Sequence, residues 1–220
     1  MMIPYIKRIV GVAALCSCVL GIGCGGGSQA TQTTTPNQPP GTVTVATGSH
    51  VLGDATSKVT IIEFSDIQCP YCKSFHTDTE PQIVQTYVNT GKARFAFRHF
   101  PLSTIHQNAE IAAEAAECAA KLGGNDTFWN YLDMLFTNGQ GNGTGLDAAS
   151  LKQYAADLHL DSASFNTCLD NHETAAIVSK DSADGRAAGV SGTPTFFING
   201  KILVGAQTFS TFKALIDAEL

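Results

Sequence analysis

The sequence predicts a mixed α/β domain whose sheet is interrupted by a block of helices. Residues 59–65 and 93–100 are β-branched or alternating apolar runs, typical of buried strands. From about residue 103 to residue 188 the apolar residues recur at helical spacing instead. Strands return at 195–198 and 201–204, on either side of Asn199-Gly200, a strong signal for a tight hairpin turn. This order predicts a split α/β fold with a helical insertion.

The remaining elements follow from periodicity and from local signals. We expect a short edge strand at 42–46 and a helix over 70–90 that is kinked by Pro81. An N-cap at Asp126 separates the first two helices of the insertion. The expected helices of the insertion and of the C-terminus are centred on 111–122, 128–136, 151–158, 165–169, 174–188 and 209–220.

The N-terminal residues are typical of an export signal. Lys7-Arg8 precede the uncharged, mainly apolar residues 9–22, which are fewer than the ~20 needed to span a bilayer as a helix. A Gly-, Ser-, Thr- and Pro-rich tract follows. We therefore expect a signal peptide in 1–23, a disordered tether in 24–41, and one domain in 42–220 with its helical insertion at about 103–188.

This signal resembles that of bacterial lipoproteins, in which a cysteine at the cleavage site receives a diacylglycerol group. Cys24 is the expected lipidation site, although the Leu of that pattern, three residues earlier, is Gly21 here. Cys18, three residues after Leu15, is an alternative, and so is a cleaved signal without lipid. The resemblance implies an extracytoplasmic protein, in the periplasm or cell envelope, that a lipid anchors to the membrane.

Charge disfavours nucleic acid as a partner. The formal net charge is −6, and loss of Lys7 and Arg8 with the signal would make it −8. Hydrophobic residues make up 44% of the chain, which suffices for a core without metals or disulfides.

The most informative motif is Cys69-Pro70-Tyr71-Cys72, at the passage from an apolar strand to a helix. The N-H groups and the dipole of a helix N-terminus favour a thiolate, so Cys69 is the expected nucleophile. Cys72 lies one turn deeper on the same face, which suits a resolving cysteine.

Half of a zinc site and a purely structural disulfide are the alternatives for this pair. A structural zinc site needs four ligands, whereas Cys118 and Cys168 stand alone, without His or Cys at metal spacing. We therefore expect a redox-active pair with no metal and no cofactor.

The pattern resembles the thioredoxin superfamily and, within it, the DsbA-like exported thiol-disulfide oxidoreductases. The resemblance covers about residues 42–220 and rests on residues 63–66 before the dithiol, on Thr193-Pro194 before the hairpin and on the helical insertion. It implies a thioredoxin fold with an inserted helical subdomain. It also implies that Pro194 is cis, that it faces the cysteines, and that Thr193 and Pro194 bind the substrate backbone.

Glu63 lies on an otherwise apolar strand and matches an acidic residue that relatives keep beneath the cysteines. It is expected to take a proton from Cys72, or alternatively to pair with a Lys or cap the sheet. Tyr71 stands where many strong oxidants of this branch have His, which implies a less oxidising couple. The sequence assigns no role to Asp66 or Gln68, and a structural role to three scattered histidines, His76, His99 and His106.

Cys118 and Cys168 lie on apolar stripes of two helices in the insertion. With the dithiol they give an even number of cysteines in an oxidising compartment, so we expect a structural disulfide between them. Free buried thiols are the alternative.

The leading functional hypothesis is a monomeric oxidase that donates the Cys69-Cys72 disulfide to exported cysteine-containing proteins and is reoxidised by a membrane redox partner. A reductase is the alternative within the same class. An isomerase is disfavoured because residues 25–41 are too short and polar for a dimerisation domain. A tethered, non-catalytic binding or chaperone lipoprotein is the alternative from another class.

Overall fold

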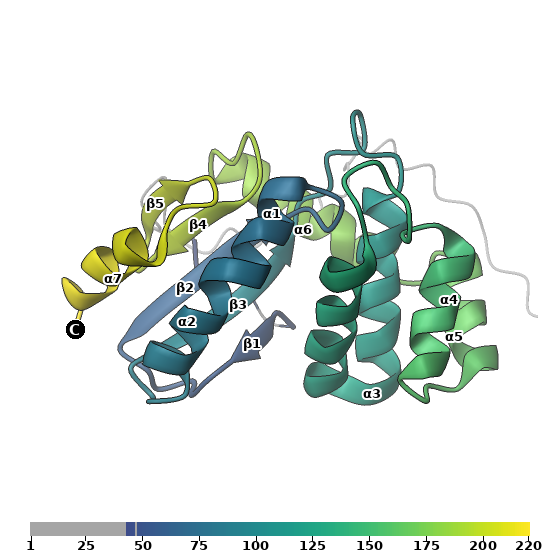
Figure 1. Cartoon of the computed structure of the whole chain (residues 1–220), viewed down its shortest axis with the longest axis horizontal. Helices are drawn as coiled ribbons and strands as arrows, with labels where there is room; N and C mark the ends of the chain where they lie inside the picture. Colours follow the sequence, from purple (N-terminus) through teal and green to yellow (C-terminus); the bar gives the residue numbers. More distant parts are fainter. Residues whose placement is uncertain (1–42, 47) are drawn as a thin grey trace, which may run out of the picture. The chain divides into compact units, whose positions relative to one another are not determined.

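The computed structural model, which describes residues 43–46 and 48–220, has a five-stranded mixed sheet at its centre (Figure 1). The strands lie in the order β1-β3-β2-β4-β5. β2 (Val59–Ser65) and β3 (Ala93–His99) pair in parallel, and every other pairing is antiparallel. The edge strands are β1 (His50–Leu52) and β5 (Lys201–Val204), and β4 (Thr195–Ile198) lies between β2 and β5. The expected signal, the tether, Cys18 and Cys24 lie outside the described residues.

The edge strand differs from the prediction. Residues 43–46 form no strand, and the edge of the sheet is β1. The Asn125 side chain accepts a hydrogen bond from the Val51 N-H and donates one to the Val51 carbonyl, both at 3.0 Å. This amide, 74 residues away, occupies the free edge of β1, a contact that periodicity does not reveal.

One helical run connects β2 to β3 and contains two wider turns. It comprises α1 (Pro70–Ser74), the π-helical η1 (Phe75–Thr79), α2 (Glu80–Ile83) and the π-helical η2 (Val84–Val88). Pro81 has no N-H for the usual bond to the fourth preceding residue, and the Glu80 N-H reaches back five residues to Phe75 O. The disturbance expected at Pro81 is thus a π turn just before it.

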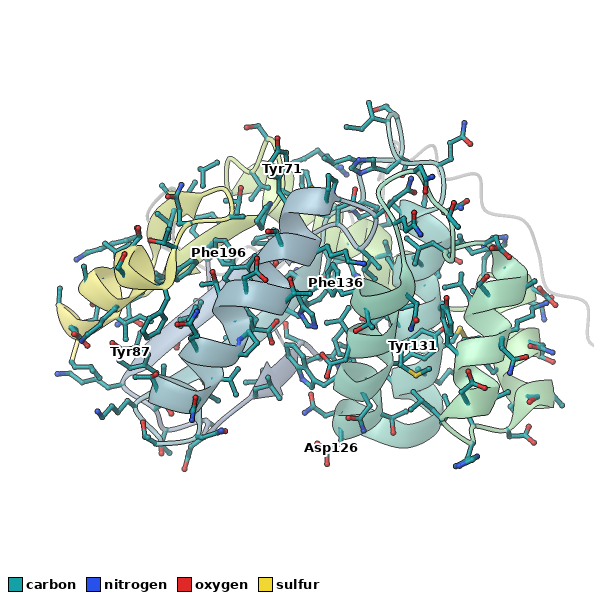
Figure 2. The ribbon with its side chains drawn as sticks, in the orientation of Figure 1. Tyr71, Tyr87, Asp126, Tyr131, Phe136 and Phe196 are labelled. Atoms are coloured by element: carbon teal, nitrogen blue, oxygen red, sulfur yellow. A yellow bond between two sulfur atoms is a disulfide. The ribbon has the colours of Figure 1, made fainter. Side chains whose placement is uncertain are left out.

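The helices between β3 and β4 form the predicted insertion. They are α3 (Ala109–Asn138), α4 (Ala148–Asp157), α5 (Ser162–Asp170) and α6 (Ala175–Ala187). Gly124, at φ 80°, divides α3 into two segments, as glycine can adopt this backbone conformation without steric cost. The N-cap at Asp126 was therefore wrong, because the second segment restarts two residues earlier. Asp126 lies inside α3, close to the turn between its two segments (Figure 2).

The sheet is covered on both faces. The α1–η2 run, α3 and α7 (Phe209–Asp217) pack on the face that carries Ile61, Phe95 and Phe196. Helix α6 covers the opposite face, behind the sheet in Figure 1. A Cβ at Gly185 of α6 would lie 2.8 Å from Phe100, so glycine permits this close approach. Among the described helices, none is long and apolar enough to cross a membrane.

Two buried ionic clusters attach the insertion to the sheet. On the α6 face, Arg98 of β3 bonds Asp181 at 2.5 Å and Asp184 at 2.6 Å. On the α3 face, Glu117 lies 3.1 Å from His50 Nε2 and 3.0 Å from His99 Nε2. Burial alone would raise the pKa of Glu117, but the hydrogen bonds to the two histidines lower it to about 2.

Replacing Glu117 with Gln should therefore destabilise the domain in a pH-dependent way. A carboxylate whose pKa falls from 4.5 to about 2 on folding stabilises the folded state fully above about pH 4.5 and loses this contribution as the pH falls through 2. The difference in free energy of unfolding between the wild type and Glu117→Gln should shrink by roughly 2 kcal/mol from pH 6 to pH 3. Urea unfolding at several pH values measures it, and a constant difference would contradict the assignment.

Candidate active site

The dithiol lies where the end of β2 meets the start of α1. Cys69 is the N-cap of α1, with an extended backbone, and Pro70 takes the first helical position. The Cys69 carbonyl accepts the Lys73 N-H at 3.0 Å, which closes the first helical turn. Tyr71 is 67% exposed at the tip of this helix (Figure 2). The local sequence therefore places Cys69 at the positive end of α1, where 4% of its surface is exposed.

The two thiols are free and differ in environment. A hydrogen bond with Cys72 is the main cause that lowers the pKa of Cys69 to about 6, and the Cys72 and Tyr71 backbone and Thr193 assist. Cys72 is completely buried, and this burial raises its pKa well above the ordinary value. At neutral pH Cys69 is thus mainly a thiolate and Cys72 a thiol.

The Thr193-Pro194 segment lies against Cys69, although 124 residues separate the two in sequence. Its peptide bond is cis. Cys69 Sγ lies 3.6 Å from Thr193 O. Pairing of β4 with β2, in which Thr195 faces Phe64, holds the segment in place. The structure thus brings together the four residues Cys69, Cys72, Thr193 and Pro194.

Glu63 lies on the sheet face covered by α1 and is 2% exposed. Its neighbours in register are Phe97 on β3 and Phe196 on β4, so aromatic rings flank it on both sides. Burial, aided by the negative charge of Glu80, raises the pKa of Glu63 to about 8. Among the ion pairs of the described residues, none involves Glu63, so the alternative pairing with a Lys is not formed.

Asp66 and Gln68 connect the dithiol to two loops. The Asp66 carboxylate is inaccessible to solvent and accepts from Gln68 N, Leu102 N and His106 Nδ1, each at 2.8 Å. The Gln68 amide accepts from Asn108 N at 2.8 Å. It also donates to Gly141 O at 3.1 Å.

Sequence reasoning missed these two roles because every partner outside the motif lies on a distant loop. The Asp66 carbonyl also accepts the Cys69 N-H at 3.0 Å. Asp66 thus fixes the backbone that leads into the dithiol, and His106 is its partner.

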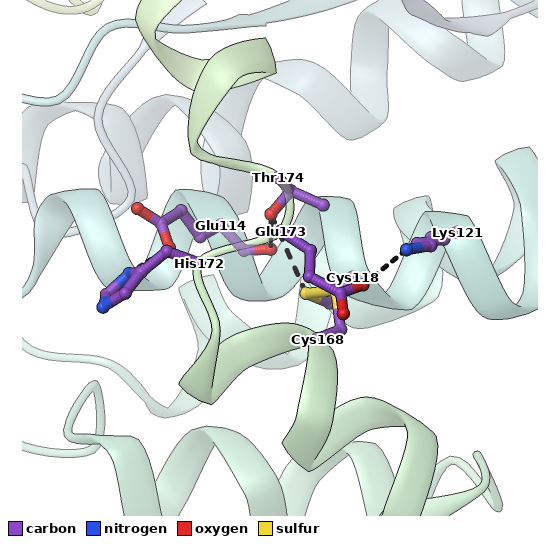
Figure 3. Close-up of a disulfide and its surroundings, with 7 residues drawn as sticks. All are labelled: Glu114, Cys118, Lys121, Cys168, His172, Glu173 and Thr174. Carbon is purple, nitrogen blue, oxygen red and sulfur yellow. Dashed lines mark hydrogen bonds and ion pairs between the residues drawn. A yellow bond between two sulfur atoms is a disulfide. The ribbon is translucent and has the colours of Figure 1, made fainter.

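The other two cysteines form a disulfide that joins α3 to α5, with an S–S distance of 1.99 Å between Cys118 and Cys168 (Figure 3). The Lys121–Glu173 ion pair lies beside it at 2.5 Å. Thr174 Oγ1 donates to Glu114 O at 2.9 Å and fixes the start of α6 at the same place.

In the described part of the chain, no cluster of three or more His, Cys, Asp or Glu side chains is placed to hold a metal ion. His99 and His106 take part in the Glu117 and Asp66 networks described above. His76, in contrast, lies on the same helix as the dithiol, in an ion pair with Glu80. The spacing of four residues between Cys72, His76 and Glu80 was the signal that could have linked them to the site.

Two thiols of unequal pKa are suited to disulfide exchange, in which a thiolate attacks and the second thiol resolves the mixed disulfide. The fold is that of the DsbA-like thiol-disulfide oxidoreductases. A family model described as Thioredoxin matches residues 45–218, and the chain belongs to this family. The thioredoxin fold with a helical insertion, predicted from the sequence, is confirmed.

Individual relatives agree with this assignment. The chain is 29% identical over 178 residues to disulfide bond formation protein D of Bacillus subtilis, covering 79% of this chain and 78% of that protein. It resembles the crystal structure of oxidised BdbD from Bacillus subtilis with a TM-score of 0.73 and 27% identity, over 79% of this chain and 93% of that one.

A second kind of relative is much longer. The chain is 35% identical over 167 residues, or 76% of its length, to the Na(+)/H(+) antiporter NhaA 3 of Salinispora tropica. It spans only 24% of that protein.

Proposed function

We propose that this protein is an exported thiol-disulfide oxidoreductase that transfers the Cys69-Cys72 disulfide to cysteines of exported proteins. The observation that carries the proposal is the difference between the two thiols, with a pKa of about 6 at Cys69 and a raised pKa at Cys72. The name of the Bacillus subtilis relative, disulfide bond formation protein D, supports the same activity.

The oxidase reaction begins with the disulfide form. A substrate thiolate attacks Cys69 Sγ, the Cys69-Cys72 bond breaks, and Cys72 leaves with the electron pair and takes up a proton. A second substrate thiolate then attacks the substrate sulfur of the mixed disulfide and displaces Cys69 as a thiolate. The substrate has lost two electrons and the protein has gained them. A low pKa makes Cys69 a good leaving group in this second step.

Glu63 is the proposed proton carrier for Cys72. With a pKa of about 8 its carboxyl holds a proton at neutral pH and can supply it to the departing Cys72 thiolate. In the reverse direction the carboxylate accepts that proton as Cys72 attacks. Thr193 and Pro194, next to Cys69 Sγ, are the proposed contacts for the substrate backbone.

Disulfide transfer leaves the protein reduced, so each cycle needs an oxidant. We propose a membrane redox partner that removes the two electrons through the same pair of cysteines. A stabilised Cys69 thiolate favours the reduced form of the protein and hence oxidation of the substrate.

The Cys118–Cys168 disulfide is proposed to be structural. It lies within the helical insertion and closes a loop of 50 residues. On the chain-entropy model such a cross-link stabilises the fold by ~4 kcal/mol.

Trapping of mixed disulfides tests the assignment of the two cysteines. In Cys72→Ser, Cys69 should form long-lived disulfides with partner proteins, since no thiol remains to resolve them. The matched control, Cys69→Ser, should trap few, because Cys72 has no exposed surface and its raised pKa keeps it a thiol. Non-reducing electrophoresis of cell extracts measures both variants. Accumulation of complexes on Cys72 in the control would reverse the assignment.

The redox potential of the purified domain tests the direction of electron flow. Equilibration with glutathione should give a potential above about −180 mV, in the range of protein disulfide isomerase and DsbA, if the protein is an oxidase. A value near about −270 mV, as in thioredoxin, would assign it as a reductase.

Membrane attachment through lipid at Cys24 is proposed on the likeness of the N-terminus to lipoprotein signals. Cells grown with a labelled fatty acid should give a labelled wild-type protein and an unlabelled Cys24→Ser variant. Label that persists in the variant would move the anchor to another residue, for which Cys18 is the alternative.

A further inference from the structure

We propose that His76 and Glu80 are positioning residues that together set the pH at which Glu63 exchanges its proton. This inference rests on the proposed function of Glu63 and assigns that control to a pair of charges on the same helical run as the dithiol.

Cys72, His76 and Glu80 lie at intervals of four residues along this run. The π turn of η1 contains more residues than an α turn and so keeps side chains four apart close to one line. Cys72 and Glu80 are buried, and the His76 side chain is only 10% exposed. The run thus carries one thiol and two oppositely charged groups on its inner side.

The run packs on the sheet beside Glu63. The Phe75 ring, next to His76, packs on the Phe196 ring at a centroid distance of 4.5 Å. Phe196 is the residue directly opposite Glu63 on β4. The run is therefore anchored, at the residue before His76, over the part of the sheet from which Glu63 projects.

His76 is held between two carboxylates. Its Nδ1 forms an ion pair with Glu80, and its Nε2 lies 2.7 Å from Asp133 Oδ1 of α3. The ring packs on Phe136 of α3 at 4.4 Å, where Figure 2 shows Phe136 between α3 and the α1–η2 run. Burial alone would lower the pKa of His76, but the carboxylates raise it to about 10. His76 is therefore a cation at neutral pH.

The two charges act on Glu63 in opposite directions. The Glu80 carboxylate disfavours a second negative charge nearby and raises the pKa of Glu63, whereas the His76 cation lowers it. The other titratable groups that face Glu63 are Cys69 and Cys72 of α1. The strands beside it contribute only aromatic rings at these positions, Phe97 and Phe196.

Loss of either His76 or Glu80 should therefore shift the pH at which the Glu63 carboxyl loses its proton. Without Glu80 the carboxyl would lose its proton at lower pH and be less able to supply it to Cys72. Without His76 the carboxyl would hold its proton to higher pH and be less able to accept one. With both charges present, Glu63 can both supply a proton to Cys72 and accept one from it near neutral pH.

Titration of the Glu63 carboxyl carbon by ¹³C NMR in the reduced protein tests the proposal, with Glu63→Gln to assign its signal. The midpoint should lie near the pKa of about 8 in the wild type. It should move down by about one pH unit in Glu80→Gln and up by about one in His76→Asn. In the double variant it should return toward the wild-type value. The rate of mixed-disulfide resolution against pH should shift in the same directions.

Asp78→Asn is the matched control. It removes a carboxylate from the same π turn, but one that is exposed and accepts from the Ser74 hydroxyl at 3.2 Å. The midpoint of Glu63 should not move in this variant. Equal shifts in Asp78→Asn and Glu80→Gln would mean that the effect is not specific to the pair and would overturn the proposal.

If His76→Asn fails to fold because Glu80 is left buried without a counter-ion, Glu80→Gln decides alone. An unchanged midpoint in Glu80→Gln, or a shift in the same direction in both single variants, overturns the proposal. The NMR titration does not depend on turnover. Opposite shifts in a protein without exchange activity would support the role of His76 and Glu80 and refute the proposed function. An active protein whose midpoint does not shift would support the proposed function and refute the role of His76 and Glu80.

Discussion

Burial of ionisable groups beneath the first turn of α1 is the constraint on which the site depends. Cys69 lies at the end of the helix, where backbone N-H groups and the Cys72 thiol stabilise its negative charge. Cys72 and Glu63 lie deeper, where the absence of water favours their neutral forms. The hydrogen bond between the thiols and the deeper burial of Cys72 together separate two cysteines of the same motif into a thiolate and a thiol.

The helical insertion contributes directly to this burial. Helix α3 covers the sheet face that carries Glu63, and Trp129 of α3 packs its ring at 6.2 Å from that of Phe97, beside Glu63. The last turn of α3 and the residue after it also approach the helix of the dithiol, since Lys73 Nζ donates to Thr137 O at 3.0 Å and to Gly139 O at 2.8 Å. The insertion is thus part of the wall that excludes water from the site, and the sheet alone would leave Glu63 open on one side.

The sequence predicted the features that are local or carry a motif, and missed those that depend on distant partners. The strand before the dithiol, the Asn199-Gly200 turn and the helical insertion depend on neighbouring residues, and the structure contains each of them. The edge strand was misplaced because β1 depends on β3 and on the Asn125 amide. Asp66 had no assigned role because Leu102 and His106 reach it from another loop. Hydrogen bonds across 36 or 40 residues leave no periodic trace in a sequence.

The distribution of counter-ions explains why Glu63 differs from the other buried charges. Most buried acids and bases of the described chain are paired: Asp66 with His106, Glu80 with His76, Glu117 with His50 and His99, and Arg98 with Asp181 and Asp184. Each pair offsets the cost of removing its charges from water. Glu63 has no such partner, and its pKa rises to about 8 instead. The unpaired Glu63 carboxyl beneath the dithiol therefore costs the fold some stability, unlike the paired charges. At this position a neutral, protonated carboxyl can supply a proton to Cys72, which explains why Glu63 is left without a counter-ion.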